Sequence, residues 1–276
     1  MNSSISQTHG SVVSKEDRTK LSTLERVLLL LPIAGGFAFG VFPLLLGGAF
    51  GAALGFPGND SFAYRLGGAA TLGYAVALMM GLRQSDWTPL RLVVIATLTF
   101  NLASIFACVV QLMAGETNIL VYLILGTSIA ITAVSAWLLN RHAGAERSAA
   151  DTSVWYTRFI VLGTVLSAVF GLMPLLIPAL GAKLLGFYGT DVFLIRQAGA
   201  ASLGYAVMGV YGLRSGAWRE LRLPLVMALV FNGFSFVASL VALFSSEPVF
   251  ITVVIAAASL FVTFVGTIAY QRSGKL

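Results

Sequence analysis

The chain has 276 residues, of which 58% are hydrophobic and only 10% are charged. A soluble domain carries about a quarter charged residues, so this chain could not cover its surface in water, and the soluble classes of protein are excluded. The formal charge of +6 would be typical of a nucleic-acid binder, but the basic residues fall in loops between apolar stretches. The composition therefore predicts an all-α polytopic membrane protein without a nucleic-acid partner.

The N-terminal segment, residues 1–25, is polar and lacks the apolar core of a signal peptide. We expect it to be a cytoplasmic tail, partly disordered, rather than a cleaved signal sequence. The single cysteine, Cys108, lies in an apolar run, which excludes an intramolecular disulfide and a two-thiol redox site.

Eight apolar stretches are long enough to cross a bilayer as helices, because about 20 residues span its hydrocarbon core. They are 27–50, 62–83, 91–114, 118–139, 159–178, 192–213, 222–244 and 248–270. The segment between Pro43 and Gly55 is too long for a plain loop. We expect it to bend after the proline into a short helix in the membrane interface.

Lysine and arginine are distributed unevenly between alternate loops. One side carries only Arg65, Lys183 and Arg196. The other side carries Lys15, Arg18, Lys20, Arg26, Arg83, Arg91, Arg141, Arg147, Arg158, Arg214, Arg219, Arg222, Arg272 and Lys275. Cytoplasmic loops are the ones enriched in Lys and Arg, so both termini are predicted to be cytoplasmic.

An internal repeat relates the two halves of the chain. A shift of 131 residues aligns 40–101 with 171–232, and 29 of the 62 positions are identical. We interpret the chain as two four-helix repeats, 26–139 and 159–271, with a cytoplasmic linker at 140–158 and a cytoplasmic tail at 272–276. Each repeat has an even number of spans, so the two are expected to be parallel and related by an axis along the membrane normal.

Small residues form a face on the second helix of each repeat. Ala69 and Gly73 lie on this face in the first repeat, and Ala200 and Gly204 take the same places in the second. Such faces allow helices to approach closely in lipid. We expect the second and third helices of each repeat to pack together through them.

Each repeat contains the pattern LGF-x-G-x-D followed by R-x-x-G-A-A-x-L-G-Y, and its third helix has a central asparagine. This arrangement resembles the four-helix bacterial membrane domains grouped as DoxX-like. The resemblance implies a multi-pass protein of the bacterial cytoplasmic (inner) membrane. Some relatives are associated with quinone or thiol redox chemistry, but the single cysteine and the lack of a membrane-embedded histidine argue against that chemistry here.

Charged residues on the sparsely basic side suggest two structural roles. Asp60 and Asp191 precede the second helix of each repeat and are expected to be its N-caps, since a carboxylate accepts hydrogen bonds from the free backbone N–H groups.

The two arginines on that side are expected to form ion pairs. Arg65 would pair with Glu116, and Arg196 with Glu247, because both glutamates lie in the loop after the third helix. The alternative is that these side chains contact lipid headgroups.

Polar residues form one face of the third helix at the expected depth of the bilayer midplane. Their spacing of three and four residues is helical, and an unpaired amide at that depth would be costly. The candidate residues for an interhelical polar contact or a ligand site are Asn101, Ser104, Gln111, Tyr74, Asn232, Ser235 and Tyr205. We expect a Tyr–Asn hydrogen bond within each repeat. The second repeat has Ala242 in place of Gln111, so the halves are not expected to bind a ligand equally.

These residues contain no catalytic constellation and no metal-ligand spacing, and no cofactor is predicted. The favoured function is non-catalytic: an accessory subunit of a membrane complex, or a bundle that binds lipid or an apolar small molecule. Two alternatives stay open, a transporter of neutral or lipidic cargo and a component of a membrane redox enzyme that relies on a partner or borrowed cofactor. The expected partners are membrane lipids and other membrane subunits.

Overall fold

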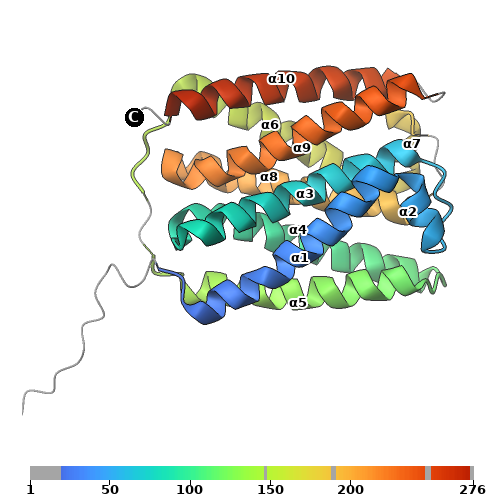
Figure 1. Ribbon diagram of the computed structural model, residues 1–276, viewed down its shortest axis with the longest axis horizontal. Helices are drawn as coiled ribbons and strands as arrows, with labels where there is room; N and C mark the ends of the chain where they lie inside the picture. Colours follow the sequence, from blue (N-terminus) through green and yellow to red (C-terminus); the bar gives the residue numbers. More distant parts are fainter. Residues whose placement is uncertain (1–19, 146–147, 188–190, 246–249, 274–276) are drawn as a thin grey trace, which may run out of the picture.

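The computed structural model describes residues 20–145, 148–187, 191–245 and 250–273, and these form ten helices (Figure 1). The helices are α1 (Thr23–Leu46), α2 (Gly48–Ala53), α3 (Ser61–Gln84), α4 (Trp87–Met113), α5 (Ile119–Arg141), α6 (Val154–Leu176), α7 (Pro178–Leu185), α8 (Val192–Ser215), α9 (Trp218–Phe244) and α10 (Phe250–Ser273). The eight long helices run roughly alongside one another in an elongated bundle.

Seven helices of the described residues are long and apolar enough to cross a membrane: α1, α3, α4, α5, α6, α9 and α10. The chain is therefore an all-α, multi-pass membrane protein. Helix α8 has 24 residues but is not among the seven, since it is less apolar. Its second turn carries the charged and amide side chains of Arg196 and Gln197, and the helix is rich in glycine.

Helix boundaries differ from the predicted ones where glycine and polar caps intervene. The first span was expected to reach residue 50, but α1 ends at Leu46 because Gly47 has a φ of +57°. Helix α2 follows directly and is the short helix expected after Pro43. The linker is shorter than 140–158, because α5 continues to Arg141 and α6 begins at Val154.

The two ends of the bundle differ in charge. The end that holds the α3–α4, α5–α6 and α8–α9 connections is called the linker end, and the end with α2 and α7 is called the short-helix end (Figure 1). The helix ends and connections at the linker end carry Lys20, Arg26, Arg83, Arg91, Arg141, Arg158, Arg214, Arg219, Arg222 and Arg272. Among the described residues, the short-helix end has only Arg65, Lys183 and Arg196 as Lys or Arg.

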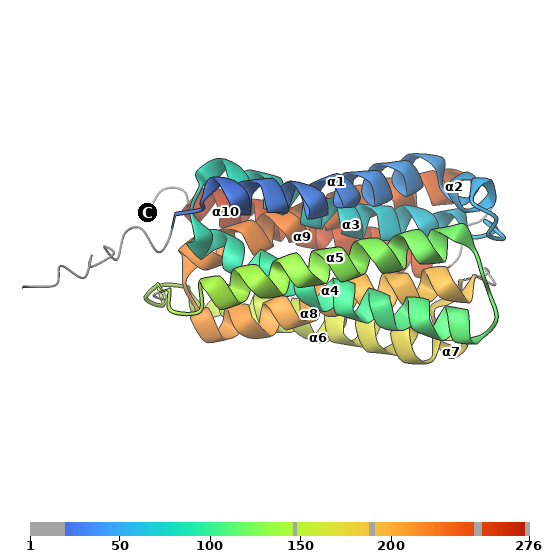
Figure 2. The same ribbon diagram turned by 90° about the horizontal axis from the view of Figure 1, so that it is seen from below.

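The second and third helices of each half pack across the two halves of the chain. Helix α3 lies along α9, and α8 lies along α4 (Figure 2), whereas α3 touches α4 and α8 touches α9 much less. The prediction that the second and third helices of one half pack together is therefore wrong. Each second helix instead packs much more on the third helix of the other half than on the third helix of its own half.

The packing of α3 on α9 and of α8 on α4 is called the crossing between the halves. Two glycine residues allow these helices to approach each other closely. A Cβ atom on Gly73 would lie 2.7 Å from the carbonyl oxygen of Met227 on α9, and one on Gly204 would lie 2.7 Å from that of Ala96 on α4. Both distances are shorter than real Cβ contacts. The small-residue faces thus allow close helix packing, as predicted, but the partner helix belongs to the other half of the chain.

Two buried tyrosines complete the crossing. The Tyr74 hydroxyl donates to the carbonyl oxygen of Ala201 at 2.7 Å, and the Tyr205 hydroxyl donates to that of Ala70 at 3.1 Å. The two rings meet edge to face, with centroids 5.2 Å apart. Both hydrogen bonds are related by the same 131-residue shift as the sequences. Each tyrosine therefore satisfies its hydroxyl on the opposite half.

Replacement of Gly204 by alanine tests the crossing. The new methyl group would press on the backbone of α4, so we expect Gly204→Ala to lower the stability by about 2 kcal/mol, as overpacking does. The control is Gly163→Ala on the exposed face of α6, where nothing lies within 4 Å of a Cβ atom. Thermal unfolding in mild detergent should show a loss for Gly204→Ala alone. Equal melting temperatures for the two variants would contradict the crossing.

Candidate ligand cavity

A cavity of about 130 Å³ lies within the first half of the chain. Its walls come from α1, α3, α4 and α5, with α8 of the other half closing one side. Helix α1 packs closely on α3, and α4 on α5, but these two pairs make few contacts with each other. In Figure 1, α1 and α5 lie near each other at the linker end and diverge toward the short-helix end. The cavity is the space between the two pairs, and it is partly open to the surface.

The part of the cavity toward the linker end is apolar. Pro32 of α1, Leu78 of α3 and Ile131 of α5 line it. Two neighbouring glycines of α1, Gly35 and Gly36, contribute no side chain to the wall. This portion can accept a hydrocarbon group, because the transfer of such a group from lipid to an apolar cavity costs little free energy.

A chain of polar side chains lies nearer the short-helix end. The Ser104 hydroxyl of α4 donates to Oε1 of Gln197 on α8 at 2.7 Å, and the Ser128 hydroxyl of α5 donates to Oγ of Ser104 at 3.2 Å. Nε2 of Gln197 lies 3.5 Å from the sulfur of Cys108. Ser104, Ser128 and Gln197 all line the cavity. Three helices thus present linked hydroxyl and amide groups to its interior.

A carboxyl group forms the wall at the short-helix end. Oδ2 of Asp191 accepts a hydrogen bond from the Tyr64 hydroxyl at 2.5 Å, and Oδ1 accepts one from the backbone N–H of Leu194 at 3.0 Å. Burial raises the pKa of the Asp191 carboxyl, the two hydrogen bonds lower it, and the nearby carboxyls of Glu116 and Asp60 raise it further. The net effect is a pKa above the ordinary value, so ionisation of this group is disfavoured.

Three of the predicted site residues line the cavity: Asn101, Ser104 and Tyr74. Gln111 is buried but does not line it. The expected Tyr–Asn hydrogen bond is wrong. Nδ2 of Asn101 donates to the carbonyl oxygen of Thr97 at 2.8 Å, on its own helix. The amide is therefore satisfied one turn away, which leaves Tyr74 to bond across the halves.

The corresponding residues of the second half make equally local contacts. Nδ2 of Asn232 donates to the carbonyl oxygen of Ala228 at 2.9 Å. Tyr205 makes a second, longer hydrogen bond of 3.4 Å to the carbonyl oxygen of Met227. The buried hydroxyl of Ser235 has no hydrogen-bond partner among the described residues. These residues do not line the cavity of the first half.

The two predicted aspartate N-caps at the short-helix end are confirmed. Asp60 is the N-cap of α3 and accepts from the backbone N–H of Ala63 at 2.9 Å, and Asp191 caps α8 in the same way.

The arginines do not form the expected pair in the first half. The ion pairs within 4.0 Å among the described residues do not include Arg65 with Glu116. The Arg65 guanidinium instead packs over Gly47, where a Cβ atom would lie 2.9 Å from its central carbon. Contact with lipid headgroups stays the prediction for Arg65. Glu247, the expected partner of Arg196, lies outside the described residues.

Three residues that line the cavity were not predicted from the sequence: Gln197, Ser128 and Tyr64. Gln197 and Tyr64 stand where the other half has Leu66 and Ile195, so neither belongs to the shared pattern. A polar residue in one repeat with an apolar counterpart in the other was the feature of the sequence that could have indicated these positions. Gln197 could also be linked to Ser104 only once α8 was known to pack on α4.

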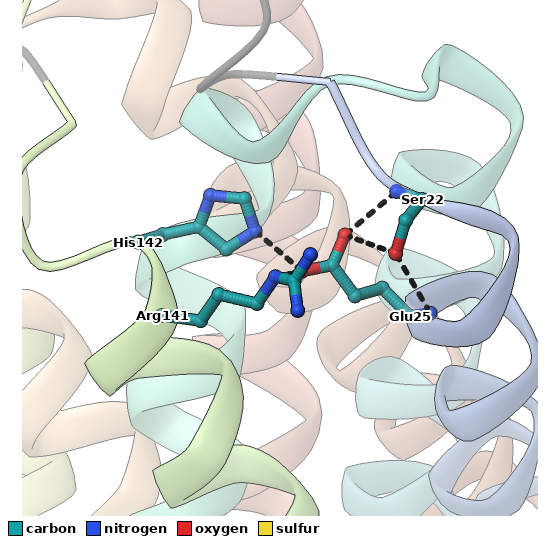
Figure 3. A network of polar contacts seen from close by, with 4 residues as sticks. All are labelled: Ser22, Glu25, Arg141 and His142. Carbon is teal, nitrogen blue, oxygen red and sulfur yellow. Dashed lines mark hydrogen bonds and ion pairs between the residues drawn. The ribbon is translucent and has the colours of Figure 1, made fainter. Parts of the chain in front are cut away.

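A second polar cluster lies at the linker end (Figure 3). Glu25 of α1 is 1% exposed, and its carboxylate accepts from the backbone N–H and the hydroxyl of Ser22 at 2.6 and 2.9 Å. Nε of Arg141 and Nε2 of His142 each lie 2.9 Å from its other oxygen. The His142 ring stacks on Trp87, with centroids 4.4 Å apart. This cluster ties the start of α1 to the end of α5, and both oxygens of the buried Glu25 carboxylate have partners in it.

Comparison with protein-family models, curated proteins and solved structures found no match. Within the described ranges, no group of three or more His, Cys, Asp or Glu residues could hold a metal ion. The cavity and its lining are the features of the described residues that indicate a function.

Removal of Glu25 tests the role of the linker-end cluster. We expect Glu25→Ala to lower the stability by about 2 kcal/mol, between the values for exposed and fully buried ion pairs. The matched control is Arg219→Ala, which removes an exposed ion pair with Asp86 and should cost less than about 1 kcal/mol. Thermal unfolding in detergent measures both. Equal losses in the two variants would show that Glu25 has no special structural role.

Proposed function

We propose that this protein is a non-catalytic membrane protein that holds an apolar or amphipathic small molecule in the cavity between α1, α3, α4 and α5. The cavity itself supports this proposal. A dry, apolar cavity of about 150 Å³ in a protein core binds benzene, so a space of about 130 Å³ that is partly open can take a hydrocarbon group. Binding pockets are typically apolar with a few placed polar groups, which describes this lining.

The lining also suggests an orientation for the bound molecule. Pro32, Leu78 and Ile131 surround the part toward the linker end, whereas Gln197 and Asp191 lie toward the short-helix end. The second part holds the linked hydroxyl and amide groups and the carboxyl group, which could bind a polar head. We infer that the head faces the short-helix end and the apolar portion faces the middle of the bundle.

The seam between α1 and α5 offers a path from the bilayer. A Cβ atom on Gly35 of α1 would lie 3.7 Å from Cγ2 of Thr127 and 3.8 Å from Cδ1 of Ile131, both on α5. These are ordinary van der Waals distances, and α1 and α5 make few contacts elsewhere. Entry from the side suits a molecule that is already dissolved in lipid.

The membrane context belongs to the same proposal. We infer a tandem duplication of a DoxX-like domain, placed in a bacterial cytoplasmic membrane with both termini in the cytoplasm. The excess of Lys and Arg at the linker end supports this orientation. Equivalent close contacts support the duplication: Gly40 packs on Leu72 as Gly171 packs on Leu203.

A leucine at position 35 tests the proposed binding site. Gly35 lines the cavity and has room for a Cβ atom, so we expect Gly35→Leu to fold while its side chain occupies the space. The matched control is Gly126→Leu on α5, where the glycine is exposed and a Cβ atom has nothing within 4 Å.

The measurement is mass spectrometry of molecules extracted from protein purified in mild detergent. We expect one class of lipid-like molecule to accompany the wild-type protein and Gly126→Leu at a similar ratio, and to fall several-fold in Gly35→Leu. Equal amounts in all three proteins would contradict the proposed site.

A further inference from the structure

We propose that the molecule held in the cavity is a cationic amphiphile, with an amine or quaternary ammonium head against Asp191 and its apolar chain toward Pro32 and Leu78. This inference rests on the proposed binding function and adds the chemical class of the ligand. Three features of the lining carry it: its charge, the partners of Asp191 and the aromatic rings around that carboxyl group.

The first feature is the charge of the wall. Among the described residues that line the cavity, Asp191 has the sole carboxyl group, and there is no lysine, arginine or histidine. An anionic head would therefore meet a carboxyl group and no compensating cation. Glu116 and Asp60 act on Asp191 in the same sense as further negative charges. The short-helix end of the cavity is consequently unfavourable for carboxylate or phosphate heads.

The second feature is the lack of a cation beside a buried carboxyl group. Asp191 is 4% exposed, and no ion pair among the described residues includes it. Its partners are the Tyr64 hydroxyl and a backbone N–H. A buried carboxylate without a counter-ion is costly, so the neutral acid is favoured as long as no cation is present. A ligand ammonium at this place would supply the missing positive charge.

The third feature is a group of aromatic side chains at the same end. Phe50, Phe56, Tyr64 and Phe193 line the cavity together with Asp191. The rings of Phe56 and Phe193 are stacked, with centroids 5.5 Å apart. Aromatic rings attract cations through their π faces, and several rings together are a common way to bind quaternary ammonium groups. The rings thus favour the same class of head as the carboxyl group does.

Three compounds with the same ten-carbon chain isolate the contribution of the head. We would measure binding of decyltrimethylammonium, decan-1-ol and decanoate to the full-length protein in maltoside micelles by equilibrium dialysis, with empty micelles as the blank. The ammonium should bind about tenfold more tightly than the alcohol, because only the ammonium can attract the Asp191 carboxylate and the faces of the aromatic rings electrostatically. Decanoate should bind more weakly than either.

Asp191→Asn then tests the residue, and Asp60→Asn is its matched control. Both aspartates are N-caps at the same end of the bundle, and asparagine caps a helix as well as aspartate does. Asp60 does not line the cavity. We expect Asp191→Asn to remove the tenfold preference for the ammonium and Asp60→Asn to keep most of it.

Two results would overturn the cationic head. One is equal binding of the ammonium and decanoate by the wild-type protein, which needs no variant to fold. The other is an equal loss of preference in the two asparagine variants. Failure of the binding function itself has a different signature: binding of all three compounds would then be the same in Gly35→Leu as in the wild-type protein.

Discussion

The close crossing of helices between the two halves is the constraint on which the rest of the structure depends. In lipid, helices gain little from hiding apolar surface, so they associate through close packing and hydrogen bonds. Gly73 lets α3 approach the backbone of α9, and Gly204 lets α8 approach that of α4. Tyr74 and Tyr205 fill the space between and donate their hydroxyls to carbonyl groups of the opposite half. Neither half can form this core alone.

The cavity follows from that crossing. Because α4 is held against α8 and α3 against α9, the pairs α1–α3 and α4–α5 of the first half stay apart. The space between them is closed on one side by α8, which brings Gln197 to Ser104 and Asp191 to Tyr64. The proposed site thus combines a wall from each half. Glu25 fastens the linker end of α1 to α5 through Arg141, so the two pairs remain tied where the cavity ends.

Much of the fold could be predicted from the sequence, because length, apolarity and loop charge are local properties. The position of the short helix after Pro43 and the capping of α3 by Asp60 are likewise set by neighbouring residues. Which helices pack on each other could not be predicted in this way, because it depends on residues that are far apart in the sequence. A face of small residues at Gly73 shows that a helix packs closely, but it does not show on which helix. The cavity residues were therefore found in part: Asn101 and Ser104 were predicted from their helical spacing, whereas Gln197 required the packing of α8 on α4.

The most direct test of this account is an experimental map of the protein in lipid bilayer discs that resolves side chains. We expect α3 to lie on α9 and α4 on α8. We also expect elongated density that is not protein between α1 and α5, with its compact end within hydrogen-bonding distance of Asp191 and its chain passing Asn101. The account would be contradicted if α3 packed on α4 within one half, or if α1 closed onto α5 with no space between them.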